Sequence, residues 1–113
     1  MDQVTTYKKI VRELVEYVYS LCPHSDEVEV QKITDDANGH YLLYSVGWQG
    51  MDWVYGSFVH LDVRENGRVW LQHDGTDLNI ADELARRGIP KNNIVVGFQP
   101  PHLRPLMEDF AVA

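Results

Sequence analysis

The sequence is poor in cysteine, in positive charge and in long apolar runs, and each shortage excludes a class of protein. A single cysteine, Cys22, rules out an intramolecular disulfide, so we expect a reducing environment. No stretch approaches the roughly 20 apolar residues of a membrane helix, and the N-terminus lacks the continuous apolar core of a signal peptide. These features predict a cytoplasmic protein with no membrane contact.

Positive charge is outweighed by negative charge. Ten Lys and Arg residues face seventeen Asp and Glu residues, which gives a formal net charge of −7. Affinity for the phosphate backbone depends largely on Lys and Arg displacing counterions. The balance therefore argues against direct non-specific nucleic-acid binding. The cluster Arg86, Arg87 and Lys91 is explained by the preference of cations for a helix C-terminus.

The length and composition suit one compact domain. The chain has 113 residues, of which 44% are hydrophobic, and no linker or repeat divides it. We therefore treat residues 1–113 as a single domain.

The N-terminal segment has the periodicity of an amphipathic helix. Apolar residues recur at steps of three and four, with charged residues between them. They are Val4, Tyr7, Val11, Leu14, Val18 and Leu21. This stripe predicts a long helix whose apolar face is buried in its own domain or, in part, against a second copy of the chain in a homo-oligomer.

Four segments with extended character follow. They are Val28–Ile33, His40–Trp48, Trp53–Val63 and Arg68–His73, separated by turn-forming residues. The last two flank Asn66-Gly67, which is typical of a two-residue type I′ hairpin.

Placing Glu65 opposite Arg68 fixes the register of this hairpin. It pairs Val63 with Trp70, Asp62 with Leu71, Leu61 with Gln72, and His60 with His73. One face then carries Val59, Leu61, Val63 and Trp70, and the other Phe58, His60, Asp62, Leu71 and His73.

The remaining sequence predicts a short helix and a tail. Asn79 is expected to cap a helix that ends at Gly88, and Ile94–Phe98 has the pattern of a short extended segment. Prolines from Pro100 onward favour an extended course. The predicted class is α+β: a four-stranded antiparallel meander sheet packed with a long N-terminal helix and a short second helix, followed by an extended Pro-rich C-terminal tail.

Histidines and acids on the predicted hairpin suggest a metal site or acid–base chemistry. Residues two apart on a strand share a face, so His60 and Asp62 lie together, and the hairpin brings His73 alongside, next to Asp74. These residues are the candidate ligands for zinc or a similar ion, and the candidate acid–base pairs. Strand His and Asp residues more often serve hydrogen bonds at sheet edges, and no nucleophile-elbow sequence surrounds Ser57. We therefore predict no catalytic residue, no bound metal and no cofactor.

The aromatic residues Trp48, Trp53, Tyr55 and Trp70 have two interpretations. A platform that stacks nucleic-acid bases needs interleaved positive charge, which is scarce near these rings. Core packing combined with a protein-interaction surface explains them better, because Trp and Tyr are enriched at protein interfaces.

A series of short motifs runs in order along nearly the whole chain. They are Val46-Gly47-Trp48, Val54-Tyr55-Gly56, His60-Leu61-Asp62-Val63, Val69-Trp70-Leu71-Gln72, Asp74-Gly75-Thr76, Ile80-Ala81, Glu83-Leu84, Gly88-Ile89-Pro90-Lys91, Val96-Gly97-Phe98 and Phe110-Ala111-Val112. Together they resemble the XisI family, the fdxN element excision controlling factors of nitrogen-fixing filamentous bacteria. The resemblance implies an accessory role in programmed excision of a DNA element, alongside a site-specific recombinase and a XisH-type companion protein. It supplies no catalytic residues.

Three hypotheses about function follow. The first is a non-enzymatic control factor that contacts the XisH-type companion, and the recombinase as a further partner. Its candidate contact residues are Trp48, Trp53, Tyr55, Trp70, Arg104 and Phe110. The second is a sequence-specific DNA-binding directionality factor, and the third is a small metal- or histidine-dependent enzyme using His60, Asp62 and His73. The acidic balance and the lack of an assembled reaction centre favour the first.

Overall fold

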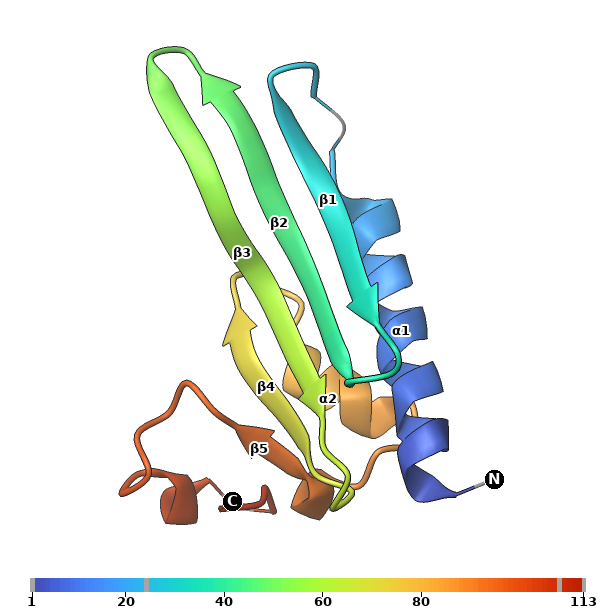
Figure 1. The fold of residues 1–113 in the computed structure, drawn as a ribbon. Helices are drawn as coiled ribbons and strands as arrows, with labels where there is room; N and C mark the ends of the chain where they lie inside the picture. Colours follow the sequence, from blue (N-terminus) through green and yellow to red (C-terminus); the bar gives the residue numbers. More distant parts are fainter. Residues whose placement is uncertain (1, 24, 108, 113) are drawn as a thin grey trace.

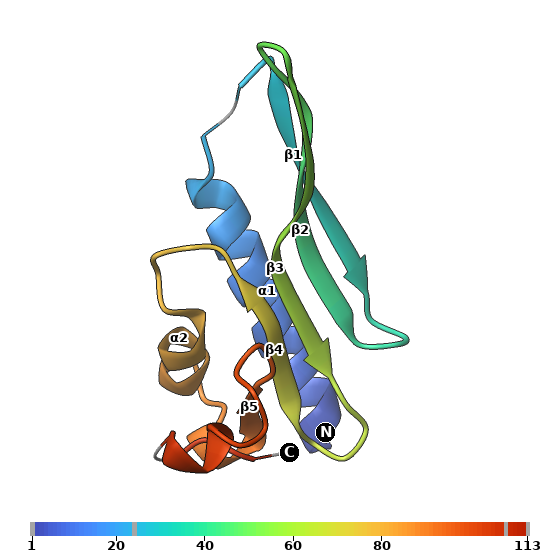
Figure 2. The ribbon, with the colours of Figure 1, turned by 90° about the vertical axis from the view of Figure 1, so that its left-hand side faces the viewer.

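The computed structural model describes residues 2–23, 25–107 and 109–112. Two α-helices, two 3-10 turns and five strands follow one another along the chain (Figure 1). They are α1 (Gln3–Leu21), β1 (Val28–Asp35), β2 (His40–Gln49), β3 (Asp52–Val63), β4 (Val69–Asp74), α2 (Ile80–Arg86), η1 (Lys91–Asn93), β5 (Ile94–Val96) and η2 (Arg104–Leu106). The strands form one sheet in the order β1-β2-β3-β4-β5, and both helices lie on the same side of it (Figure 2).

The first helix follows the predicted stripe. Its N-terminus is capped by the Asp2 carboxylate, which accepts a hydrogen bond from the Thr5 backbone N–H at 2.8 Å. The buried residues of α1 are Tyr7, Val11, Leu14, Val15 and Val18. Leu21, the last member of the stripe, is 51% exposed, so the buried face ends before the helix does. Neither helix in the described ranges combines the length and apolar character that a membrane-spanning helix requires.

The sheet has a fifth strand that makes it mixed, which corrects the predicted four-stranded antiparallel meander. β1 to β4 pair antiparallel, but β5 pairs parallel with β4, with Val69 opposite Ile94 and Leu71 opposite Val96. A strand that returns through a helix runs parallel to the strand it left, and α2 makes this crossover. All three residues of β5 are buried, as expected for a parallel strand with both faces covered.

The β3–β4 hairpin has a different turn from the one that Asn66-Gly67 suggested. The Gly67 N–H donates to the Arg64 carbonyl and the Arg64 N–H to the Arg68 carbonyl, which leaves a three-residue loop. Gly67 alone takes the left-handed conformation, with φ of 84°, whereas Asn66 keeps a negative φ. This is the geometry of a type I turn followed by a left-handed glycine, not of a type I′ turn.

The turn shifts the register by one residue near its closed end. Val63 pairs with Val69, Asp62 with Trp70 and Leu61 with Leu71, so three of the predicted pairs are wrong. A bulge at Gln72 then restores the predicted pairing of His60 with His73. Leu71 and Trp70 consequently exchange the faces assigned to them: Leu71 is buried, and Trp70 shares the face of Asp62. Phe58 also changes face, because a second bulge beside it turns its side chain toward the hydrophobic core.

The C-terminal tail folds back on its own domain rather than running as a simple extended segment. After the 3-10 turn Arg104–Leu106, Ala111 forms a parallel bridge with Val95 and donates its N–H to the Ile94 carbonyl at 2.9 Å. Met107 and Phe110 pack against the core. The tail therefore covers the outer edge of β5.

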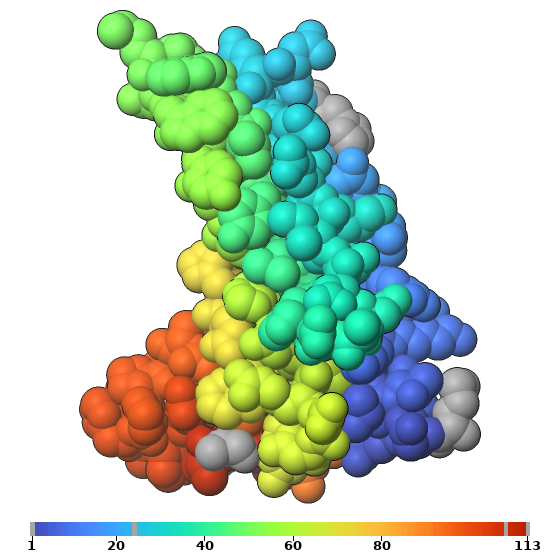
Figure 3. Space-filling view, in the orientation of Figure 1, coloured from blue at the N-terminus to red at the C-terminus, as the bar shows by residue number. Residues whose placement is uncertain are grey.

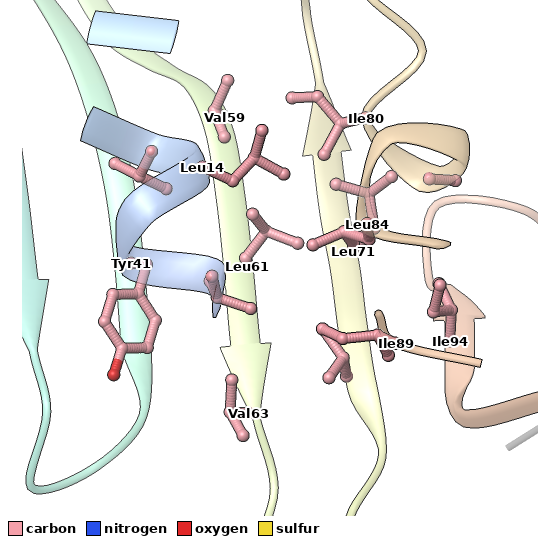
Figure 4. Close-up of a cluster of buried hydrophobic side chains, with 14 of the residues drawn as sticks. Leu14, Tyr41, Val59, Leu61, Val63, Leu71, Ile80, Leu84, Ile89 and Ile94 are labelled. Atoms are coloured by element: carbon pink, nitrogen blue, oxygen red, sulfur yellow. The ribbon is translucent and has the colours of Figure 1, made fainter. Parts of the chain in front are cut away.

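The hydrophobic core fills the space between the sheet and the two helices (Figure 4). Alternate residues of β2, β3 and β4 point toward side chains of α1 and α2. Among those with no exposed surface are Tyr41, Leu43, Val59, Leu61, Ile80, Leu84, Ile89 and Ile94. The buried Tyr41 ring carries its hydroxyl outward, where it donates to the Asp36 carboxylate at 2.6 Å.

The observed register predicts unequal costs for two leucine truncations. Leu71→Ala removes a side chain that is 1% exposed and should lower the free energy of unfolding by about 2–5 kcal/mol. Leu42→Ala, on the opposite face and only half-buried, should cost about 1 kcal/mol or less. Urea unfolding monitored by tryptophan fluorescence measures both, and equal losses would contradict the assigned faces.

Candidate functional site

One face of the sheet is left open because α1 and α2 both cover the other. Figure 3 views this open face, where side chains of β1, β2 and β3 lie at the surface. Tyr41 and Leu43 of β2 point into the core, so the residues that alternate with them point outward. The cross-strand pairs on the open face are His40 with Asp62, Leu42 with His60, Tyr44 with Ser57, Val46 with Tyr55, and Trp48 with Trp53.

The half of the open face next to the β2–β3 turn carries an aromatic strip, formed by Tyr44, Trp48, Trp53 and Tyr55. The rings of Trp48 and Trp53 lie 5.4 Å apart, those of Trp53 and Tyr55 are stacked at 6.5 Å, and those of Tyr44 and Tyr55 lie 5.7 Å apart. Trp48, Trp53 and Tyr55 are 59%, 53% and 67% exposed. The strip is therefore an ordered aromatic surface in contact with solvent, since the rings hold one another in place.

The sequence grouped Trp70 with these aromatics, but the structure places it on β4, opposite Asp62 and away from the strip. Two guanidinium groups lie near its ring, with Arg64 5.0 Å and Arg104 5.2 Å from the ring centroid. Arg104 also donates to the carbonyls of Gly97 and Gln99, both at 3.1 Å. Arg104 thus fastens the tail to the sheet.

Phe110, another residue proposed from the sequence as a contact, is partly buried. Its ring packs against the core and has the Lys91 ammonium 5.5 Å from its centroid. Like Arg104, it makes its described contacts within the chain.

Beside Trp70, which pairs with Asp62 across β3 and β4, lies the Asp62 cluster, which comprises His40, His60, Asp62 and Gln72. One oxygen of Asp62, Oδ1, lies 2.7 Å from His40 Nδ1 and 2.9 Å from His60 Nε2. The other oxygen, Oδ2, accepts a hydrogen bond from Gln72 Nε2 at 3.2 Å and has an Arg64 guanidinium nitrogen at 3.6 Å. The Asp62 side chain is 8% exposed, whereas His40 and His60 are 50% and 33% exposed.

The partners of Asp62 decide its ionisation. Burial alone would raise the pKa of Asp62, but the hydrogen bonds from His40 and Gln72, and the neighbouring His60, outweigh burial and hold the pKa below its ordinary value. Asp62 is therefore an anion surrounded by donors on the floor of the open face.

The structure brings together only part of the histidine and acid set that the sequence proposed. His60 and Asp62 meet, and His40 joins them, with ligand atoms of all three within 4.8 Å of one another. His73 lies opposite His60 in the register but is exposed and stands outside this group. Asp74 instead caps the turn before α2, accepting from the N–H and hydroxyl of Thr76 and from the Ile80 N–H.

Sequence analysis missed His40 because its position depends on the β2–β3 register. That register follows from the turn at Gly50, which has φ of 62°, and from the bulge beside Phe58. The turn residues were visible in the sequence, but the bulge was not, and without it His40 does not pair with Asp62.

A pocket of about 340 Å³ lies away from these groups, on the helix side of the sheet. Its lining includes Cys22, Pro23, Val28, Val30 and Phe58, and none of the residues of the Asp62 cluster or the aromatic strip lines it. Burial raises the pKa of the Cys22 thiol, which disfavours its thiolate. The pocket thus lacks an activated nucleophile at Cys22.

Comparison with known proteins identifies the family. The family model described as XisI protein matches residues 1–112. The chain belongs to the XisI family. The sequence matches no curated protein.

Two solved structures extend the likeness to the whole XisI fold. A XisI-like protein from Anabaena variabilis is 37% identical and superimposes with a TM-score of 0.91, covering 97% of this chain and 99% of that one. The fdxN element excision controlling factor XisI from the same organism is 34% identical, with a TM-score of 0.87 and coverage of 99% and 100%. The α+β architecture is therefore that of XisI proteins.

The lowered pKa of Asp62 predicts a pH-dependent contribution to stability. An unfolded Asp titrates near pH 3.9, so the contribution is present above about pH 4 and is lost as the pH falls through the lower folded-state pKa. The difference in unfolding free energy between the wild type and Asp62→Asn should therefore shrink as the pH falls from about 4. Urea unfolding of both proteins across the acid range measures it, and a difference that grows toward acid would contradict the assignment.

Proposed function

We propose that this protein is a non-enzymatic control factor for the excision of a DNA element and that it acts by binding a XisH-type companion protein. Membership of the XisI family and the name of its structural neighbour, an excision controlling factor, support this role. A controlling factor requires a surface for another macromolecule rather than a reaction centre. The surface we assign to the companion is the aromatic strip.

The observation that carries the proposal is the exposure of the strip. Three large aromatic side chains, Trp48, Trp53 and Tyr55, are each more than half exposed on a face that no helix covers. Met51, in the turn between them, is 95% exposed. Aromatic side chains and Met are enriched at protein interfaces, and central Trp and Tyr residues supply most of the binding energy there.

Charge supports a protein partner with a basic surface. The net charge of −7 would accelerate encounter with such a partner and repel free nucleic acid. Many cations of the chain are also engaged with acids. Ion pairs hold Arg12, Lys32, Arg64, Arg86, Arg87 and Lys91. Direct DNA binding would have to break or share these pairs, so it is the less favoured alternative.

Truncation of the strip tests the proposal. A XisH-type protein is co-expressed with the wild type, Trp53→Ala or Tyr17→Ala, and the mixtures are compared by size-exclusion chromatography and calorimetry. Trp53→Ala should weaken the complex at least 10-fold, or about 1.4 kcal/mol, because it removes a central aromatic contact. Tyr17→Ala is the matched control, an aromatic residue of α1 that is 45% exposed and lies away from the open face.

The same measurement distinguishes the alternatives. No co-migration of the wild type with the companion at low or high salt would remove the proposal. Unchanged affinity of Trp53→Ala would place the contact elsewhere. A salt-sensitive shift of element-end DNA by the chain alone would favour the directionality-factor hypothesis. Dimerisation that Trp53→Ala abolishes would assign the strip to a homo-oligomer.

A further inference from the structure

Two imidazoles and one carboxylate converge in the Asp62 cluster. Three potential ligand atoms converge: Nδ1 of His40, Nε2 of His60 and Oδ1 of Asp62, all within 4.8 Å of one another. They come from neighbouring positions on two paired strands, since His40 is opposite Asp62 and His60 is two residues before it. We propose that these three residues bind a divalent transition-metal ion of the zinc class.

The ligand types suit such an ion. Two imidazole nitrogens and one carboxylate oxygen are donors that Zn²⁺ and its neighbours in the transition series accept, whereas Mg²⁺ and Ca²⁺ prefer oxygen alone. Three protein ligands leave one tetrahedral position unfilled. His40 and His60 are 50% and 33% exposed, so that position is directed toward the open side of the sheet, where water or a partner's side chain can occupy it.

The carboxylate is already oriented for this role. Its two oxygens have separate partners: Oδ1 points to both imidazoles, and Oδ2 is held by the Gln72 amide at 3.2 Å. A hydrogen bond to the non-ligating oxygen is the outer-shell support that positions metal-binding carboxylates. Gln72 is therefore a positioning residue.

The two imidazoles must rearrange around Asp62 to admit the ion. The N···O distances of 2.7 and 2.9 Å are those of hydrogen bonds, and ligands about 2.0–2.1 Å from a tetrahedral ion lie roughly 3.3 Å apart. Each imidazole must thus retreat by about half an ångström and give up the proton that it shares with Asp62. His40, half exposed at the start of β2, has room to do so.

Arg64 opposes the ion and provides a distinctive test. Its guanidinium lies 3.6 Å from Asp62 Oδ2, so it competes for the same carboxylate charge. The Trp70 ring, 5.0 Å away, is a second contact for Arg64. Replacing Arg64 should therefore strengthen metal binding, an effect that a simple hydrogen-bond network does not produce.

The experiment titrates ZnCl₂ into untagged, chelator-treated protein by calorimetry and repeats the titration with CoCl₂ while recording the visible spectrum. We expect one ion per chain and a cobalt spectrum of low coordination number. His40→Ala and His60→Ala should weaken binding at least 10-fold, and Gln72→Ala about 10-fold. Arg64→Ala should tighten it. His102→Ala, in the exposed tail, is the matched control and should change nothing.

The outcomes distinguish a specific metal site from nonspecific binding at the surface. No saturable zinc binding below about 100 μM, or binding that survives both His40→Ala and His60→Ala, overturns the proposal. So does an equal loss in His102→Ala. Circular dichroism checks that each variant is folded. If His60→Ala does not fold, His40→Ala still tests the site, because the His40 side chain is half exposed. The result is independent of the XisH-type companion, which is absent from the titration.

Discussion

Both helices pack against one face of the sheet, and the rest of the molecule depends on that asymmetry. The buried face is made of aliphatic residues at alternate positions of β2, β3 and β4, closed by α1 and α2. The opposite face receives no helix, so its residues must meet solvent, pair with one another or bind something else. On this face the exposed rings of Trp48, Trp53 and Tyr55 lie together as one aromatic surface.

The open face divides into two parts with different chemistry. In the part beside β4, Asp62 is buried among His40, His60, Gln72 and Arg64. The cations Arg64 and Arg104 lie over the ring of Trp70. These contacts satisfy the polar groups and join the tail to the sheet. Beyond them the β2–β3 hairpin carries the aromatic strip, whose rings contact one another. One part is satisfied internally, and the other leaves its apolar surface to solvent.

The sequence predicted the parts of the fold that local periodicity determines. The stripe of α1, the four meander strands and the Asn79 cap of α2 were all visible, because each depends on residues close in the chain. The parallel pairing of β5 was not visible, since Ile94 meets Val69 only after the chain has passed through α2. The β3–β4 register was wrong because Asn66-Gly67 suits two turn types, and tertiary packing of Leu71 selected the three-residue loop.

The same distinction applies to the site. His60 and Asp62 could be placed together from their spacing alone, whereas His40 required a bulge that no local pattern announced. The strip residues Trp48, Trp53 and Tyr55 were recognised as candidates by type, and the pairing of Trp48 with Trp53 across β2 and β3 explains why they share a face. Trp70 shares that face but lies beside Asp62, Arg64 and Arg104 rather than in the strip, which residue type alone does not indicate.

The most direct test of the central claim is hydroxyl-radical footprinting of the protein alone and mixed with the XisH-type protein proposed as its partner. This measurement reports the exposure of individual side chains, including the Trp, Tyr and Met side chains of the strip and its turn. The account predicts that modification of Trp48, Met51, Trp53 and Tyr55 falls in the complex while modification of Tyr17 on α1 does not. Unchanged modification of the strip, with protection confined to α1 or the tail, would contradict it.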